Sequence, residues 1–160
     1  MAASITLTIN GAARAISAPD DTPLLTVLRN ELGLKSARFG CGHEQCGACM
    51  VLLDGVPAYS CTLPVGSVGA RAVTTVEGVG NAAAPHAVQT AILEEQAGQC
   101  GYCLSGIQIS AAALLARTTS PTRDEIKQAL EPNLCRCGVH LRVIHAVERA
   151  ASMLRAGDAA

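Results

Sequence analysis

Eight cysteines are the residues of this chain whose type and spacing most directly predict chemistry. An even number of cysteines predicts disulfides in a secreted chain, whereas in a reducing compartment it indicates metal binding or redox chemistry. The amino terminus has neither a charged leader nor a long apolar run, so no signal peptide is expected and the second interpretation is favoured. The cysteines fall into two sets: Cys41, Cys46, Cys49 and Cys61, and then Cys100, Cys103, Cys135 and Cys137.

The first set has the spacing C-x4-C-x2-C-x11-C. Its first three cysteines match the plant-type pattern whose four thiolates bind a [2Fe–2S] cluster. A loop that encloses such an anion needs inward-pointing amide groups and small residues, so that the backbone can approach it closely. Zinc and disulfides are the alternatives, although disulfides leave the small residues unexplained. These small residues are Gly40, Gly42, Gly47 and Ala48.

The second set combines C-x2-C with C-x-C, and 31 residues separate the two motifs. The spacing alone permits a second iron–sulfur cluster, a zinc site or a thiol redox pair. The positions of the cysteines relative to the expected helices favour the cluster, because Cys103 is the first residue of one helix and Cys137 directly precedes another. Helix starts carry free N–H donors and the positive end of the helix dipole, and both stabilise an anion.

The first half of the chain has the pattern of strands with one helix. The turn signals Asn10-Gly11 and Asp54-Gly55 each join two alternating segments, which predicts two β-hairpins. Pro23 begins an amphipathic helix that Gly33 ends. The expected strands are 4–10, 13–18, 48–53, 56–61 and 72–76, and the expected helix is 23–32.

The second half has the pattern of helices alone, expected at 86–97, 103–117, 122–130 and 139–155. Small residues between the halves indicate a boundary. The sequence therefore predicts an α+β protein, because strands precede a run of helices. Its expected parts are a β-rich domain at 1–77, a linker at 78–85, a four-helix domain at 86–156 and a tail at 157–160.

Composition argues against two classes of partner. The formal net charge is −1 and the only aromatic residues are Phe39, Tyr59 and Tyr102, so neither a basic field nor a stacking platform for nucleic acid is expected. No apolar run reaches the roughly 18–20 residues of a membrane helix, so insertion into a bilayer is not expected. We expect the chain to fold in the bacterial cytoplasm and to stay there or to be exported with a partner to the periplasmic side.

The cysteine segments resemble the small iron–sulfur subunit of the xanthine oxidase family of molybdenum hydroxylases. The resemblance runs in order over residues 5–153 and includes both cysteine sets. It rests on Gly40-Cys-Gly-His-Glu-Gln-Cys-Gly-Ala-Cys49, Asp54-Gly55, Ser60-Cys61, Gln99-Cys-Gly-Tyr-Cys103 and Asn133-Leu-Cys-Arg-Cys137.

This resemblance implies a plant-ferredoxin-like β-grasp domain followed by a four-helix bundle, with one [2Fe–2S] cluster on each cysteine set. It also implies a large partner subunit with a molybdopterin cofactor, which hydroxylates an aldehyde or an N-heteroaromatic ring. Electrons would pass from molybdenum to the second set and then to the first. Gln99 and Cys137 would lie near the pterin, and the chain alone would have no catalytic residue.

Three segments depart from the family's common pattern: Glu44 replaces a glycine, Leu104-Ser105 replaces Thr-Pro, and Gly138-Val-His140 replaces Thr-Gly-Tyr. These variants resemble nicotinate dehydrogenases, isoquinoline oxidoreductases and aldehyde dehydrogenases of acetic-acid bacteria, whose acceptor is a cytochrome c component. We therefore expect a cytochrome c acceptor rather than a flavin subunit. A free-standing two-cluster ferredoxin and a zinc-binding scaffold are the alternative functions.

Overall fold

The computed structural model describes residues 5–157 of the chain. These residues form one mixed sheet and six α-helices, so the α+β prediction is confirmed. Three expectations lie outside the described residues: the first strand's start at Ser4, the nature of the amino-terminal segment, and the tail at 158–160.

The sheet contains five strands in the order β2-β1-β5-β3-β4. Both predicted hairpins are present, and Asn10 (φ 50) and Gly11 (φ 76) take the positive φ values that a tight hairpin turn requires. β5 completes the sheet, parallel to β1 and antiparallel to β3. The strands are β1 (Ile5–Ile9), β2 (Ala12–Ile16), β3 (Met50–Leu53), β4 (Val56–Tyr59) and β5 (Val73–Thr74).

Helix α1 (Leu24–Asn30) packs against the sheet, where Pro23 occupies the cap position instead of the first helical turn. The helix and strands enclose an aliphatic core, as expected of a chain with few aromatic residues. Its most buried side chains include Leu7, Ile9, Ile16, Leu24, Leu28, Val51 and Val73.

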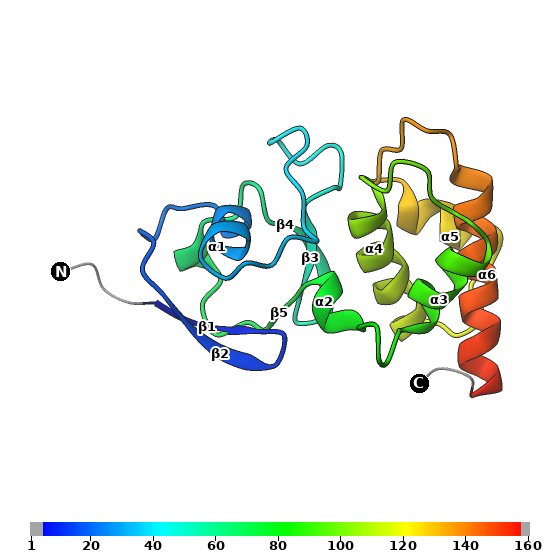
Figure 1. Cartoon of the computed structure of the whole chain (residues 1–160), viewed down its shortest axis with the longest axis horizontal. Helices are drawn as coiled ribbons and strands as arrows, with labels where there is room; N and C mark the ends of the chain where they lie inside the picture. The colour runs from blue at the N-terminus through cyan, green and yellow to red at the C-terminus, as the bar shows by residue number, and fades with distance from the viewer. Residues whose placement is uncertain (1–4, 158–160) are drawn as a thin grey trace.

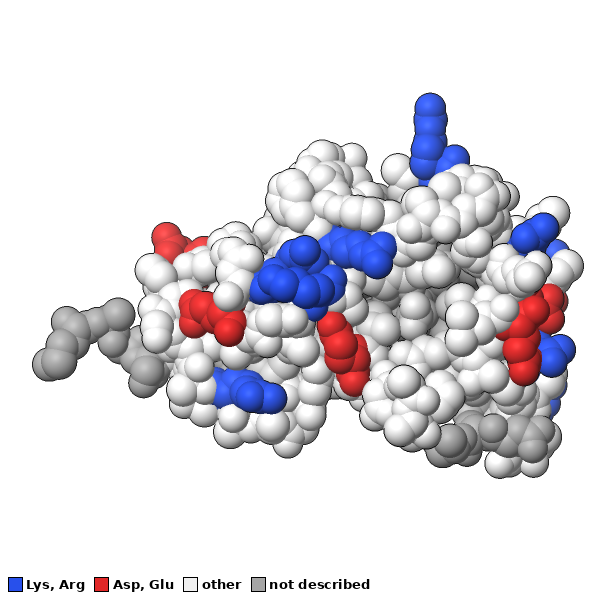
Figure 2. All heavy atoms as spheres, viewed as in Figure 1, with Lys and Arg blue, Asp and Glu red and all other residues white. Residues whose placement is uncertain are grey.

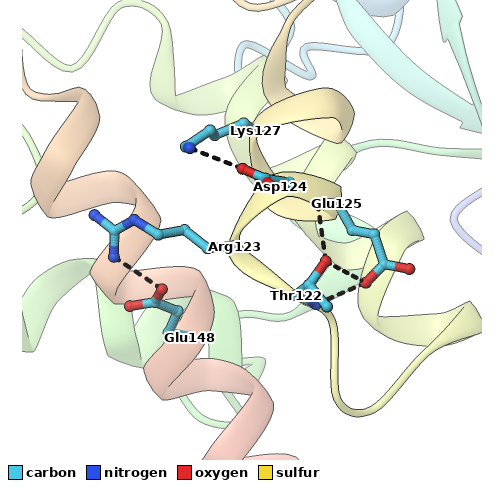
Figure 3. A network of polar contacts seen from close by, with 6 residues as sticks. All are labelled: Thr122, Arg123, Asp124, Glu125, Lys127 and Glu148. Carbon is cyan, nitrogen blue, oxygen red and sulfur yellow. Dashed lines mark hydrogen bonds and ion pairs between the residues drawn. The ribbon is translucent and has the colours of Figure 1, made fainter.

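Four helices make up the second half, each within three residues of the predicted bounds: α3 (Ala87–Glu94), α4 (Leu104–Arg117), α5 (Arg123–Leu130) and α6 (His140–Ala156). They bury a second, alanine-rich apolar cluster of their own. The sequence Thr122-Arg-Asp-Glu125 has the pattern of a capping box, and hydrogen bonds between Thr122 and Glu125 form that box at the start of α5 (Figure 3). Next to it, Arg123 forms a 3.0 Å ion pair with Glu148, which joins α5 to α6.

Two short elements were not predicted: α2 (Val76–Val79) and a 3-10 helix at Val65–Ser67. A four-residue helix has no amphipathic period, so only its tertiary contacts specify it. Asn10 supplies part of them for α2, because it accepts a hydrogen bond from the Thr75 amide (2.8 Å) and donates one to the Thr75 hydroxyl (3.0 Å), and Ser36 and Gln89 bond to the helix as well. β5 is consequently shorter than the expected strand at 72–76, since Thr75 caps α2.

The sheet and the helical half lie side by side, with α4 packed against β3 (Figure 1). The connections before β3, before α4 and before α6 emerge at the same end of the molecule, at the top of this view. On the face drawn in Figure 2, acidic and basic side chains form small separate groups rather than one charged surface. No helix in residues 5–157 has the length and apolarity needed to cross a bilayer.

Candidate metal centres

All eight cysteines are free thiols and lie at the ends of helices and strands or in the connecting loops. Cys103 is the N-cap residue of α4, and Cys137 lies three residues before the first residue of α6, so both predicted helix-start placements are confirmed. In the first set, Cys41, Cys46 and Cys49 precede β3, and Cys61 follows β4.

The sulfurs are arranged in pairs. The Cys100 and Cys137 sulfurs are 3.4 Å apart, and the Cys41 and Cys46 thiols also interact with each other. Two sulfurs that share one tetrahedral metal at about 2.3 Å lie roughly 3.8 Å apart, so a separation of 3.4 Å suits a shared metal. The other close pairs are Cys49 with Cys61 and Cys103 with Cys135.

Each set therefore contributes two pairs of thiols, which is the donor set of a cluster with two irons, because its four thiolates divide equally between them. Within residues 5–157, no three His, Cys, Asp or Glu side chains are close enough together to hold one metal ion. The donor chemistry of both sets fits a [2Fe–2S] cluster.

The loop of the first set directs its backbone toward sulfur, as the sequence predicted. The Gln45 amide donates a 3.2 Å hydrogen bond to the Cys41 sulfur. Hydrogen bonds from the His43 and Gln45 amides lower the pKa of Cys41 to about 6. A Cβ atom on Gly40 would lie 2.5 Å from the Cys46 sulfur, so a larger residue there would displace that sulfur.

Amide donors also surround the second set. Burial of the Cys135 thiol raises its pKa, but hydrogen bonds from the Val139, Cys137 and Gly138 amides outweigh this effect and lower the pKa overall. The Tyr102 amide lowers the pKa of Cys100, and the Cys137 thiol and the Arg38 charge add to that effect. These amides include the N-cap residue of α6, in agreement with the expected role of helix starts.

In each set, one pair is buried and the other reaches the surface. Cys49 and Cys61 are buried, whereas Cys41 and Cys46 are only half-buried. Burial raises the pKa of both Cys49 and Cys103 to about 12, so these thiols stay protonated at neutral pH unless a metal displaces the proton. In the second set, Cys103 and Cys135 are buried, whereas Cys100 is exposed and Cys137 is half-buried.

Four hydrogen bonds to backbone carbonyls connect the two ligand regions directly, and none was predicted from the sequence. The Leu134 amide donates to the Cys46 carbonyl at 3.0 Å, and the Ser105 hydroxyl donates to the Ala48 carbonyl at 2.9 Å. The Arg38 guanidinium donates to the Gly101 carbonyl at 2.6 Å, and the Tyr102 hydroxyl donates to the Phe39 carbonyl at 2.5 Å. A cavity of about 320 Å³ between the regions is lined by cysteines of both sets: Cys41, Cys46, Cys100 and Cys103.

Glycines allow the two regions to approach this closely. Gly47 has φ +72, and a Cβ atom there would lie 2.5 Å from the Pro132 carbonyl oxygen. A Cβ atom on Gly106 would overlap the Gly47 carbonyl oxygen. Both glycines belong to cysteine motifs in the sequence, but only the fold shows that they touch across the two halves.

The remaining predicted residues lie near the exposed pair of the second set. Gln99 is exposed and directly precedes Cys100, which is paired with Cys137. His140 is exposed and lines a cavity of about 260 Å³ together with Asn133, whose side-chain oxygen is buried without a hydrogen-bond partner. Among the described residues, no hydrogen bond joins His140 to a cysteine sulfur.

Comparisons with known families match both halves of the chain. Residues 7–68 match the family described as a 2Fe-2S iron-sulfur cluster binding domain, and residues 75–148 match the family described as a [2Fe-2S] binding domain. The chain is 48% identical over 155 residues to a nicotinate dehydrogenase subunit from Pseudomonas putida, which covers 97% of the chain and 99% of that relative. It is 45% identical over 138 residues to the alpha subunit of isoquinoline 1-oxidoreductase from Brevundimonas diminuta, covering 86% of the chain and 90% of that relative.

Solved structures of related enzymes have the same fold. The aldehyde oxidoreductase from Desulfovibrio desulfuricans superposes with a TM-score of 0.92 at 38% identity over 96% of the chain, which spans only 17% of that longer protein. A chain of quinoline 2-oxidoreductase from Pseudomonas putida superposes with a TM-score of 0.90 at 32% identity, with 97% of both chains covered.

Proposed function

We propose an electron-transfer role for this chain, which belongs to the small iron–sulfur subunits of the xanthine oxidase family. In this role it carries electrons from a large molybdopterin-binding subunit to an acceptor subunit. The [2Fe–2S] clusters, when bound, supply one-electron oxidation and reduction. The chain's own residues hold the clusters, shield them and fix their separation.

The observation that carries the proposal is the arrangement of eight free thiols in four pairs. Two pairs per set match a binuclear cluster, whereas a single zinc ion would gather all four sulfurs of a set around one point. We assign the first cluster to Cys41, Cys46, Cys49 and Cys61, and the second to Cys100, Cys103, Cys135 and Cys137.

We further propose that the chain consists of two domains, a β-grasp domain at 1–77 and a four-helix domain at 86–156, with a linker at 78–85. Two separate apolar clusters support this division, one from the sheet with α1 and one from helices α3 to α6. The two family matches, at 7–68 and 75–148, divide the chain at nearly the same place.

The half-exposed pair of the second set is the proposed point of electron entry. Cys100 is exposed and Cys137 is half-buried, so a partner that covers this surface can approach both, together with the exposed Gln99. We propose that the molybdopterin subunit is this partner and that its substrate is an aldehyde or an N-heteroaromatic compound, in line with the names of the relatives.

The acceptor and the site of assembly are part of the same proposal. Glu44, Ser105 and His140 favour a cytochrome c acceptor over a flavin subunit, because these variants resemble the cytochrome-linked branch of the family. Free thiols persist in reducing compartments, so we propose that the clusters are inserted in the bacterial cytoplasm, before any export with a partner.

Purification of the native complex tests this function. We expect the chain to elute with a molybdenum-containing subunit, and substrate to reduce both clusters, as followed by EPR. The variant Cys135→Ser should lose reduction by substrate while it keeps the EPR signal of the first cluster under dithionite. Elution of the chain alone would favour the free-standing ferredoxin instead, and substrate reduction that persists in Cys135→Ser would contradict the proposed route.

A further inference from the structure

We propose that Arg38 is a positioning residue for electron transfer: it clamps the turn at Cys100–Cys103 to the loop of the first cysteine set and places a positive charge beside the second. This inference rests on the proposed function. It adds a residue outside both cysteine motifs that controls the geometry and the reduction potential of the second site.

The position of Arg38 is fixed by its backbone. It lies in the connection between α1 and β3, three residues before Cys41, and its amide donates a 2.9 Å hydrogen bond to the Ala48 carbonyl. From this anchored position, its half-buried side chain extends across to the helical half. The guanidinium group reaches the Gly101 carbonyl, 63 residues away in sequence, at 2.6 Å.

A second interaction holds the same guanidinium group. Its carbon atom lies 5.2 Å from the centre of the Tyr102 ring, a cation–π geometry. Tyr102 in turn donates its hydroxyl to the Phe39 carbonyl at 2.5 Å. The two loops are therefore joined by two hydrogen bonds in opposite directions, one from each side, with the ring and the guanidinium group in contact between them.

This clamp acts on the most exposed part of the proposed ligand set. Gly101 and Tyr102 lie between Cys100 and Cys103, and Cys100 is the only one of the eight cysteines that is exposed rather than half-buried or buried. Its sulfur accepts a 3.5 Å hydrogen bond from the Tyr102 amide and contacts the Cys137 sulfur. Apart from the clamp, the turn is held by long local hydrogen bonds from the Leu104 amide to the Gly101 carbonyl (3.3 Å) and from the Ser105 hydroxyl to the Tyr102 carbonyl (3.4 Å), so loss of the clamp would give the exposed sulfur more positional freedom.

The geometry favours arginine over lysine. A planar guanidinium group can donate to a carbonyl and lie over an aromatic ring at the same time, whereas an ammonium group is a compact, strongly hydrated charge. Lysine at this position would retain the positive charge but not both contacts. The two roles of Arg38, its charge and its clamp, can therefore be separated by substitution.

The charge has a predictable effect on potential. A cluster on four thiolates is an anion that becomes more negative on reduction, so a neighbouring cation stabilises the reduced form and raises the potential. Because the guanidinium group contacts the Gly101 carbonyl, next to Cys100, loss of the charge should lower the potential of the second cluster more than that of the first.

Redox titration of the purified complex, monitored by EPR, tests this inference. The variants are Arg38→Gln, which removes charge and clamp, and Arg38→Lys, which retains only the charge. Arg14→Gln is the control, because Arg14 is an exposed arginine on β2 whose loss changes the net charge equally. We expect Arg38→Gln to shift the second cluster to a lower potential and to broaden its signal, Arg38→Lys to broaden the signal with a smaller shift, and Arg14→Gln to change neither.

An unchanged potential of the second cluster in Arg38→Gln, or an equal shift in Arg14→Gln, would overturn the inference. If Arg38→Gln does not retain the second cluster, the Arg38→Lys variant tests the inference instead. A broadened EPR signal of the second cluster in Arg38→Lys supports the clamp, whereas a signal and potential equal to wild type refute it. These results are distinct from a failure of the proposed function, in which the wild-type chain would elute without a molybdenum-containing subunit or would lack the second EPR signal.

Discussion

The main-chain amide of Leu134 donates a 3.0 Å hydrogen bond to the carbonyl oxygen of Cys46. One residue of this bond belongs to the first proposed ligand set, and the other directly precedes Cys135 of the second. The covalent route from Cys46 to Leu134 runs through β3, β4, β5 and helices α2 to α5, so this hydrogen bond is a far shorter connection between the two sets. It gives the two proposed clusters a fixed relative position and a bonded path.

Replacement of Leu134 by proline tests this connection, because proline has no amide hydrogen to donate. We expect Leu134→Pro to slow electron exchange between the clusters and to destabilise the chain by about 1 kcal/mol, the typical net value of one hydrogen bond. Leu134→Ala is the matched control, since it removes an exposed side chain and keeps the amide. Stopped-flow reduction that is equally fast in both variants would exclude a role for this bond.

The contact between Gly47 and the helical half predicts an unequal effect of two glycine substitutions. Gly47 and Gly55 both have positive φ values (+72 and +81), but only a Cβ atom on Gly47 would collide with another segment. Gly55→Ala should cost about 1 kcal/mol from backbone strain alone. Gly47→Ala should cost about 3 kcal/mol or more, because Pro132 and Asn133 must also move. Chemical denaturation measures both, and equal losses would show that the contact is unimportant.

The cysteine environments predict an order of alkylation in the metal-free chain. Amide hydrogen bonds lower the pKa of Cys41 to about 6, so its thiolate should predominate above that pH and disappear below it. Burial raises the pKa of Cys49 and Cys103 to about 12, so both should remain thiols across the neutral range. Mass spectrometry after brief iodoacetamide treatment should find Cys41 labelled first, with labelling that falls as the pH drops through about 6. Labelling at equal rates would contradict these environments.

Glu44 has a positive φ of 61, a backbone conformation that glycine adopts more easily than glutamate. Its carboxylate accepts a hydrogen bond from the Thr62 hydroxyl, next to Cys61. Glu44→Gly relieves about 1 kcal/mol of backbone strain and loses an exposed hydrogen bond of similar or smaller value, so stability should change by less than about 1 kcal/mol. The first EPR signal should persist.

Thr62→Val serves as the control for Glu44→Gly, because it removes the same hydrogen bond without a change in backbone strain. It should therefore be slightly less stable than wild type in the same denaturation experiment. Loss of the first cluster in Glu44→Gly would show that this carboxylate is essential to the loop.

Local signals in the sequence predicted much of this fold. Turn dipeptides specified the two hairpins, and the apolar period with the capping box at Thr122 located α5 and its neighbours to within a few residues. The placement of Cys103 and Cys137 at helix starts was also predictable, because each cysteine motif lies directly beside a helical pattern. Short α2 was missed, since contacts with the distant Asn10 specify it rather than its own four residues.

What the sequence could not predict is how the two cysteine sets meet. The bond from Arg38 to Gly101 spans 63 residues, and that from Ser105 to Ala48 spans 57. No sequence motif marks either bond. A backbone carbonyl is present at every residue, so an arginine or serine side chain can donate to whichever one the fold brings within reach. Such contacts follow from the packing of α4 against β3, which no local pattern encodes.

Metal and sulfide analysis of the chain, purified under conditions that exclude oxidation, tests the assignment of two [2Fe–2S] clusters most directly. We predict about four irons and about four acid-labile sulfides per chain, a red-brown colour, and two distinct EPR signals after reduction with dithionite. A colourless chain that contains zinc and no iron would contradict the assignment of both sites.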